Sequence, residues 1–281
     1  FFFFQAAINP LSDAITLELA TKENFSFSKV RTAGSLGFAI MATVTGSLIE
    51  YHINFIFILY SSLILLALLV FSTKIPKIQG YQTQQQKIKF WEVLKSPSLR
   101  KIYLYVLILS SGFGFFISFH ALYSVEQGIS VGLLGIGIMI GSFSQFPFML
   151  LFDKLYAKFG IRKIILISGL FNVVRWGLYA VWLNSYTVLF LWVLHGGTFI
   201  IIYLCLAEYV YRSVRDELKV SGQMMNFIIL QGAGQLIGGI VGGVLADMFS
   251  YDFVFGIVSI TSLLGVVYFW FSTRRNPALV D

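Results

Sequence analysis

A succession of long apolar runs, separated by short polar breaks, constrains the fold of this chain more than any other feature of its sequence. A helix needs about 20 mostly apolar residues to cross a bilayer, whereas membrane-barrel strands alternate polar and apolar residues over about ten positions. The runs show no such alternation, so each is predicted to be a membrane-spanning helix. A further run, from Phe1 to about Leu19, is expected to be a helix that lacks its front. The complete runs lie near residues 32–50, 53–73, 102–123, 130–152, 164–182, 186–208, 222–246 and 252–272.

The composition excludes most other classes of protein. Apolar residues make up 57% of the 281 residues and charged residues 12%, against roughly 45–50% and about 25% in a soluble domain. A soluble fold cannot bury this much apolar surface, and neither disorder nor a disulfide scaffold is expected. The single cysteine, Cys205, permits no thiolate metal cluster, and the three histidines lack the spacing of metal ligands. No metal and no cofactor are therefore predicted.

The positive charges predict the orientation of the spans. Of the 20 lysines and arginines, all but Arg175 fall in alternate breaks between the apolar runs. By the positive-inside rule those breaks are cytoplasmic, so the net charge of +7 reflects topology and no nucleic-acid partner is expected. The basic groups comprise Lys22, Lys29 and Arg31, then residues 74–101, 154–163 and 212–219, then Arg274 and Arg275.

The longest polar break, Thr73 to Arg100, divides the chain. Two predicted spans and the incomplete run precede it, and six spans follow it. Secondary transporters are commonly built as two halves with the solute between them, so this layout suggests two six-helix bundles with about three helices absent from the first. We expect a remnant of the first bundle at 1–73, a cytoplasmic linker at 74–101, a six-helix bundle at 102–273 and a cytoplasmic tail at 274–281.

Ionisable side chains inside spans are costly and rare, which makes each one a functional candidate. Asp13 and Arg31 lie nine residues on either side of Lys22, so a helical hairpin would bring them to a similar depth, about 10 Å inside the cytoplasmic edge at 1.5 Å per residue. A carboxylate paired with a guanidinium at that depth could bind a hydroxylated or charged solute. Alternatively, Arg31 extends to the interface and Asp13 caps a helix end after Pro10.

Arg175 and His195 are predicted to lie near the middle of the membrane on adjoining spans. Arg175 follows Lys163 by twelve residues, about 18 Å along a helix, which is too deep for its side chain to reach water. It must therefore face the bundle interior or a hydrated cavity. His195 suits hydrogen bonding to a solute or proton transfer, because a neutral imidazole titrates close to physiological pH; the alternative is a packing histidine. Gln145 and Gln235 either line a polar cavity or hydrogen-bond between helices.

A polar loop between two predicted spans resembles a motif of the major facilitator superfamily. The segment 153–163 carries an acid, Asp153, then Gly160, then the basic pair Arg162 and Lys163. It is similar to the cytoplasmic loop between the second and third helices of a half in that superfamily. The resemblance implies that these four residues take part in the conformational change.

A narrower resemblance covers essentially the whole chain. Residues 9–13 and 25–39 are similar to helices four and five of the proton-coupled permeases for lactose, nucleosides and phenylpropionate. In that group an acid and an arginine with the eighteen-residue separation of Asp13 and Arg31 contribute to the substrate site. Arg175 resembles the ninth-helix arginine of the group and His195 the tenth-helix histidine.

The sequence also departs from the lactose permease pattern. That permease carries a carboxylate one turn after the histidine, where this chain has Thr198, and a lysine on helix eleven, where this chain has Gln235. The acids expected on helices seven and eight are absent as well. The loss of both signs keeps the interior neutral, and the His-Gly-x-Thr-Phe stretch brings the chain closer to the phenylpropionate-type relatives.

These observations predict an all-α, polytopic membrane protein with the major facilitator fold and an incomplete first bundle. The expected function is alternating-access transport, by proton-coupled symport, of a sugar, nucleoside or aromatic acid. Asp13, Arg31, Arg175, His195, Gln145 and Gln235 are expected to bind the solute, with His195 and Asp13 coupling the proton. The expected setting is a monomer in a bacterial plasma membrane. Two alternatives stay open: a non-transporting remnant or sensor, and a membrane-embedded enzyme, for which no nucleophile motif is present.

Overall fold

The computed structural model describes residues 8–51, 54–74, 90–182 and 184–274, and within these residues it is helical and contains no strand. Each complete predicted span lies largely within a helix or within consecutive helical segments, and several of these helices extend further than the predicted bounds. His52 and most of the 74–101 linker lie outside the described residues. The helices are α2 (Ile8–Glu23), α3 (Phe27–Tyr51), α4 (Phe55–Lys74), α5 (Phe90–Val93), α6 (Pro97–Glu126), α7 (Val131–Val181), α8 (Thr187–Val193), α9 (Ile201–Ser213), α10 (Lys219–Phe227), α11 (Gly234–Met248) and α12 (Tyr251–Thr273).

The chain forms two compact units. One consists of Phe1–Lys29 together with Lys87–Asp281, and the other of Val30–Gln86. Helix α2 therefore belongs to the same unit as the helices that follow the linker, and it packs against α9 and α10. The assignment of 1–73 to a first bundle stays a prediction. The described part of the second unit consists mainly of residues 30–51 of α3 and of α4, because the first three residues of α3 belong to the larger unit.

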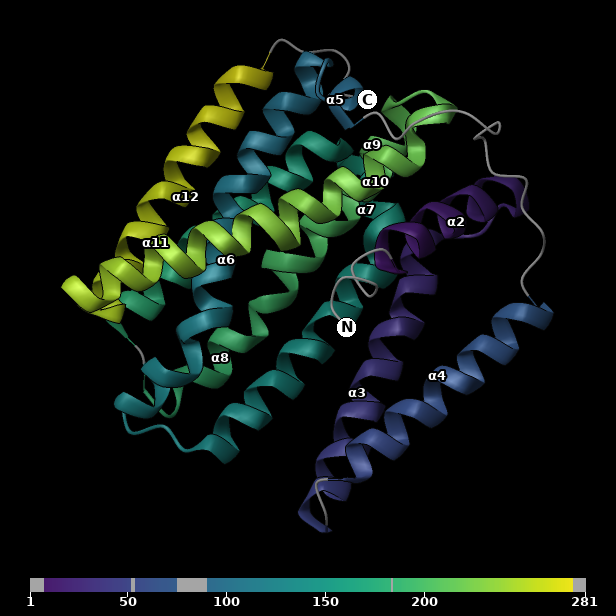
Figure 1. The fold of residues 1–281 in the computed structure, drawn as a ribbon. Helices are drawn as coiled ribbons and strands as arrows, with labels where there is room; N and C mark the ends of the chain where they lie inside the picture. Colours follow the sequence, from purple (N-terminus) through teal and green to yellow (C-terminus); the bar gives the residue numbers. More distant parts are fainter. Residues whose placement is uncertain (1–7, 52–53, 75–89, 183, 275–281) are drawn as a thin grey trace. The chain divides into compact units, whose positions relative to one another are not determined.

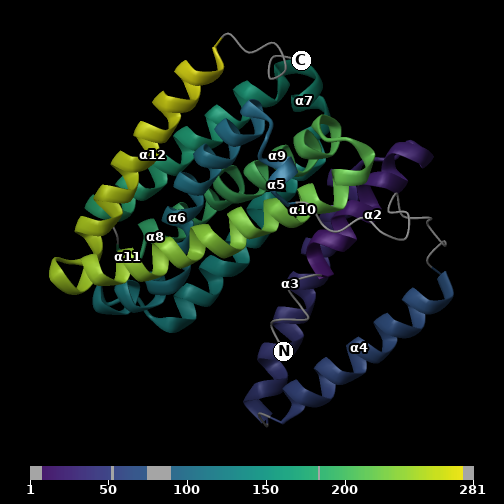
Figure 2. The same cartoon turned by 45° about the horizontal axis from the view of Figure 1, so that its top comes forward.

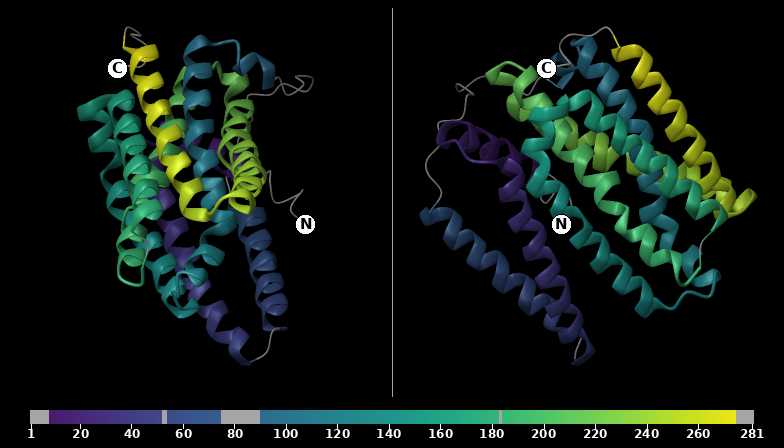
Figure 3. Two further views of the ribbon diagram at one scale, coloured as in Figure 1. Left: turned by 90° about the vertical axis from the view of Figure 1, so that its left-hand side faces the viewer. Right: turned by 180° about the vertical axis from the view of Figure 1, so that it is seen from behind.

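The larger unit is a bundle of long helices (Figures 1 and 2). Helix α12 packs against α7 and α6, α11 runs along α6, and α9 packs against α7. Figure 3 shows the same helices from the side and from behind. Five helices among the described residues are long and apolar enough to cross a membrane: 97–126, 132–181, 187–213, 216–248 and 251–273. The prediction of an all-α membrane fold is confirmed.

Serine side chains define where three of the spans begin. Ser130 Oγ accepts a hydrogen bond from the backbone N–H of Leu133 at 3.3 Å, and Ser250 Oγ accepts one from Phe253 at 3.4 Å. Ser96 caps α6 in the same way, and Pro97 follows it at the first helical position, where its missing N–H costs nothing. These caps satisfy N–H groups that would otherwise lack partners at the helix ends.

Helix α7 contains two predicted spans and is broken at Gly160. The backbone there has φ 70° and ψ 161°, a conformation that is essentially confined to glycine. Because Gly160 interrupts the helical geometry, the chain changes direction between the spans predicted at 130–152 and 164–182. The glycine of the predicted loop motif therefore has a backbone role.

Helices α6 and α11 approach each other through glycine. A methyl group placed on Gly238 would lie 1.9 Å from the carbonyl oxygen of Ser111, and one on Gly114 would lie 2.5 Å from the Cα of Gln235. Only hydrogen fits at either position. Small residues of this kind allow close packing of membrane helices, where no hydrophobic force drives association. The face of α11 that contains Gly234, Gly238 and Gly242 therefore packs against α6.

Replacement of Gly160 tests its backbone role. Gly160→Ala is expected to lower the free energy of unfolding by about 1–3 kcal/mol, because alanine must adopt the same strained conformation. Thermal unfolding in detergent measures the change. Gly135→Ala is the matched control, because Gly135 lies on the same helix with no atom within 4 Å of an added methyl group. Equal stability of the two variants would contradict the backbone role.

Candidate functional site

Arg175 is buried in the interior of the larger unit, and none of its surface is exposed. Its Nη1 donates to His195 Nδ1 at 3.1 Å and to Thr198 Oγ1 at 3.0 Å. The structure thus brings together Arg175, on α7, and His195, which ends the segment that begins with α8. The sequence predicted that both residues lie near the middle of the membrane on adjoining spans. It predicted a similar depth for the two residues but not a contact between them.

The contact with Arg175 fixes the protonation of His195. A guanidinium can only donate hydrogen bonds, so Nδ1 of His195 must be the acceptor and carries no proton. The ring proton is then on Nε2 and the imidazole is neutral; this tautomer follows from the hydrogen bond. A second proton, on Nδ1, would place two N–H groups against each other and break the contact.

Four aromatic rings enclose the guanidinium of Arg175. The distances from Cζ to the ring centroids are 4.4 Å for Phe116, 4.8 Å for Trp176, 5.6 Å for Trp192 and 5.9 Å for Tyr179. The negative faces of aromatic rings attract cations, and this attraction strengthens where water is excluded. The cage therefore partly replaces the hydration that Arg175 has lost.

The cage leaves hydrogen-bond donors unused. Arg175 Nε and Nη2 have no hydrogen-bond partner among the described residues, and neither do the indole N–H groups of Trp176 and Trp192. The Tyr179 hydroxyl lies close to the guanidinium without hydrogen-bond geometry. In the described part of the chain, no carboxylate lies within ion-pair distance of Arg175. A buried cation surrounded by free donors suits an incoming acceptor or anion.

His120, on α6, also belongs to this cluster. It is 6% exposed, and its ring centroid lies 4.5 Å from that of Phe116 and 5.3 Å from that of Trp192. Its Nε2 has no hydrogen-bond partner in the described structure. The spacing of Phe113, Phe116 and His120 along one helix face is the signal that would have indicated this position.

His195 is followed by a π-helical segment, η1 (Gly196–Ile200), whose wide turn disrupts the regular backbone hydrogen bonds. Side chains of α7 bond to it. Ser168 Oγ donates to the carbonyl of Gly197 at 2.6 Å, and Ser144 Oγ accepts from the N–H of Gly196 at 2.9 Å. Asn172 Nδ2 lies between Ser168 O and Thr198 O, at 2.9 and 3.4 Å. These bonds hold His195 and Thr198 toward Arg175.

Asp13 forms a hydrogen bond with Tyr203, to which the sequence assigned no role. The hydroxyl of Tyr203, on α9, donates to Asp13 Oδ2, and the two residues are 9% and 8% exposed. The Tyr203 ring lies tilted against Phe199 with centroids 6.2 Å apart, and Phe199 stacks on His195 at 5.9 Å. A row of rings therefore connects Asp13 to the cluster around Arg175.

The other predicted solute-binding residues are Arg31, Gln145 and Gln235. Arg31 belongs to the unit Val30–Gln86, in the first turns of α3. Gln145 is half-buried on α7 and forms no hydrogen bond with the described residues. Gln235 Nε2 donates to Gln231 Oε1 at 2.7 Å, and because Gln231 lies one turn earlier on the same helical segment, this bond does not join two helices.

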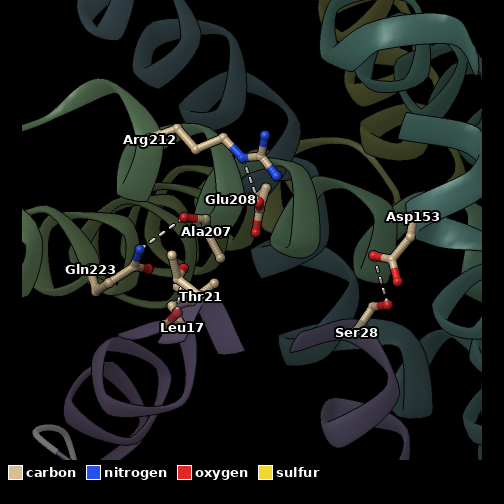
Figure 4. A network of polar contacts seen from close by, with 8 residues as sticks. All are labelled: Leu17, Thr21, Ser28, Asp153, Ala207, Glu208, Arg212 and Gln223. Atoms are coloured by element: carbon tan, nitrogen blue, oxygen red, sulfur yellow. Dashed lines mark hydrogen bonds and ion pairs between the residues drawn. The ribbon is translucent and has the colours of Figure 1, made fainter. Parts of the chain in front are cut away.

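The predicted loop motif borders a pocket of about 1190 Å³ that is lined by α2, the start of α3, α7 and α9. Ser28 Oγ donates to Asp153 Oδ1 at 3.4 Å, as Figure 4 shows. Arg162 donates to Thr273 Oγ1 at 3.0 Å and to the carbonyl of Trp270 at 3.1 Å, which ties the loop to the end of α12. Lys163 is exposed.

Comparison with known proteins gives a consistent result. The model of a family described as "MFS_1 like family" matches residues 1–257. The uncharacterized transporter YwbF of Bacillus subtilis is 27% identical over 97% of this chain and 69% of its own length. A maltose permease of Geobacillus stearothermophilus is 26% identical with the same coverage. A probable 3-phenylpropionic acid transporter of Escherichia coli is 27% identical over 74% of the chain and 55% of its own length.

The support of the π-helical segment by Ser168 is testable. Ser168→Ala removes the donor to Gly197 O and is expected to cost about 1–3 kcal/mol of unfolding free energy, the penalty of an unsatisfied buried acceptor. Thermal unfolding in detergent measures it. Ser262→Ala is the matched control, because Ser262 is fully buried and its hydroxyl has no partner in the described structure. A loss in the control as large as in Ser168→Ala would contradict the argument.

Proposed function

The chain belongs to the MFS_1 like family, whose matched relatives are membrane transporters, and from this premise we propose that it moves a small organic solute by proton-coupled, alternating-access symport. Transport, rather than catalysis, follows from the family. The proton coupling, the solute and the residues that bind it are the proposal. The printed names of relatives include a maltose permease, a probable 3-phenylpropionic acid transporter and a xanthosine permease.

The burial of Arg175 is the observation that carries the proposal. A charged side chain deep within apolar helices is expensive, and it usually marks a ligand or ion path. Arg175 has two bonds to neutral groups, an aromatic cage and unused donors. A solute that brings a carboxylate, hydroxyl or carbonyl oxygen would complete this arrangement. The aromatic rings would pack against a flat or ring-shaped solute.

Four ionisable residues are proposed to bind the solute. Asp13 and Arg31 would supply a carboxylate and a guanidinium, and Arg175 and His195 would supply a guanidinium and an imidazole. Gln145 and Gln235 are candidates for its polar lining, and the loop with Asp153, Gly160, Arg162 and Lys163 for the conformational change. The setting that fits is a monomer in a bacterial plasma membrane, with the 74–101 linker and the C-terminus in the cytoplasm.

His195 supplies a physical basis for proton coupling. Its Nδ1 lone pair accepts from Arg175, so protonation of that nitrogen and the bond to Arg175 exclude each other. Arrival of a proton would release one Arg175 donor for the solute, and departure of the proton would favour the closed pair. Binding of solute and binding of proton would then be linked through one hydrogen bond.

Uptake measurements test the coupling. In energised membrane vesicles that contain the protein, maltose, 3-phenylpropionate and xanthosine are offered as labelled solutes. At least one is expected to accumulate, and an uncoupler should abolish accumulation while leaving exchange of solute intact. Accumulation that persists after collapse of the proton gradient would refute symport, and vesicles without the protein provide the background.

Two variants of His195 separate binding from coupling. His195→Asn keeps an oxygen that accepts from Arg175 but cannot take up a proton, so exchange should continue while proton-driven accumulation is lost. His195→Phe also removes the acceptor, a bond from a charged donor worth about 1.5–3 kcal/mol, and should lose exchange as well. Proton-driven accumulation by His195→Asn would contradict the assigned role.

A further inference from the structure

The bond between Asp13 and Tyr203 joins two helices that lie far apart in the sequence. Asp13 is on α2 and Tyr203 on α9, and both side chains are nearly buried. A hydrogen bond to an ionised acceptor is roughly twice as strong as one between neutral groups. The pair therefore contributes directly to the docking of α2 on α9 and α10.

Asp13 and Tyr203 lie beside a small cavity whose other polar side chains are already hydrogen-bonded. A cavity of about 20 Å³ borders Asp13 and Tyr203 and is lined also by Gln223 and Asn226. The amide groups of these two residues already bond elsewhere in the bundle. Gln223 Nε2 donates to Ala207 O at 2.9 Å, and Asn226 Nδ2 donates to Gln223 Oε1 at 2.9 Å. The Tyr203 hydroxyl, on α9, donates to Asp13 beside this cavity.

The buried face of α2 contains Asp13, Leu17 and Ala20, which are spaced as neighbours on one side of a helix. Leu17 and Ala20 also line the 1190 Å³ pocket. Leu17 and Ala20 also belong to the same buried apolar cluster as residues of α9. Separation of α2 from α9 is expected to make this face more accessible, so the reactivity of position 20 reports on the contact.

We propose that Tyr203 is a latch that competes with solute for Asp13. Without solute, the Tyr203 hydroxyl holds the Asp13 carboxylate and keeps α2 docked on α9. A solute hydroxyl or N–H that reaches Asp13 replaces Tyr203 and releases α2. The inference rests on the proposed transport function, and it adds that the solute must present a hydrogen-bond donor to Asp13. Tyr203 is a positioning residue in this scheme, because it acts through Asp13.

The latch is tested by the reactivity of a cysteine, which requires no knowledge of the solute. In a Cys205→Ala background, Ala20→Cys places a thiol at a position that is 8% exposed, and the probe is N-ethylmaleimide applied to membrane vesicles. Tyr203→Phe keeps the ring and removes the hydroxyl. It is expected to raise the alkylation rate about tenfold, as a loss of about 1.4 kcal/mol from the closed state predicts.

Tyr103→Phe is the matched control. The Tyr103 hydroxyl is also buried and donates to Asn226 Oδ1 at 3.0 Å, but this bond joins α6 to α10 and leaves α2 out. The alkylation rate should stay at the parent value. Asp13→Ala should raise the rate at least as much as Tyr203→Phe does, and adding Tyr203→Phe to Asp13→Ala should give no further increase, because the bond between the two residues is already broken.

Three results would overturn the latch: an unchanged rate in Tyr203→Phe, an equal rise in Tyr103→Phe, or additive effects of the Asp13 and Tyr203 changes. The assay is independent of uptake. Failure of the vesicles to accumulate solute together with a rise confined to the Tyr203 and Asp13 variants would refute the proposed transport cycle but leave the contact as a conformational latch. Proton-driven uptake with unchanged alkylation would refute the latch alone.

Discussion

The interior of the larger unit depends on the cost of burying Arg175. A guanidinium removed from water loses several kcal/mol of hydration, and no carboxylate of the described chain compensates for this loss. The protein compensates with four aromatic faces and with the acceptors on His195 and Thr198. The compensation is partial, as the unused donors indicate. The four aromatic rings lie where their faces can attract the Arg175 guanidinium, with centroids 4.4–5.9 Å from its Cζ.

The irregular backbone beside His195 follows from the same need. A regular helix would direct His195 and Thr198, three residues apart, to positions set by the ordinary turn. The π-helical segment changes that spacing, and Ser144, Ser168 and Asn172 bond to the backbone groups that it disturbs. Two glycines in the segment permit close approach to α7, where a methyl group on Gly196 would collide with the carbonyl of Ser144. The backbone beside His195 is thus π-helical where His195 and Thr198 both accept hydrogen bonds from Arg175.

The sequence predicted the depth of Arg175 and His195 in the membrane, but not which neighbouring side chains they contact. Counting residues at 1.5 Å each placed Arg175 and His195 at one depth, and the structure joins them. Depth carries no information about which side of a helix faces a neighbour, so neither the bond of Tyr203 to Asp13 nor the contact of His120 with the Arg175 cluster was predicted. The π-helical segment has no strong signal in a single sequence, because the wider turn depends on side chains of α7. Asp13 was expected to be a binding residue, and its partner on α9 became visible only in three dimensions.

The packing of α6 against α11 has a mechanical consequence. Where Gly238 meets Ser111 and Gly114 meets Gln235, backbone lies against backbone with no side chain between them. At these two points there is no side-chain rotamer to rearrange, although nearby the Ser110 side chain packs on Gly234 and the Phe115 ring on Gly242. Rotation of either helix about its axis would drive bulkier residues into the two backbone contacts. We therefore expect α6 and α11 to move together, and rearrangement of the bundle to occur at interfaces filled by side chains.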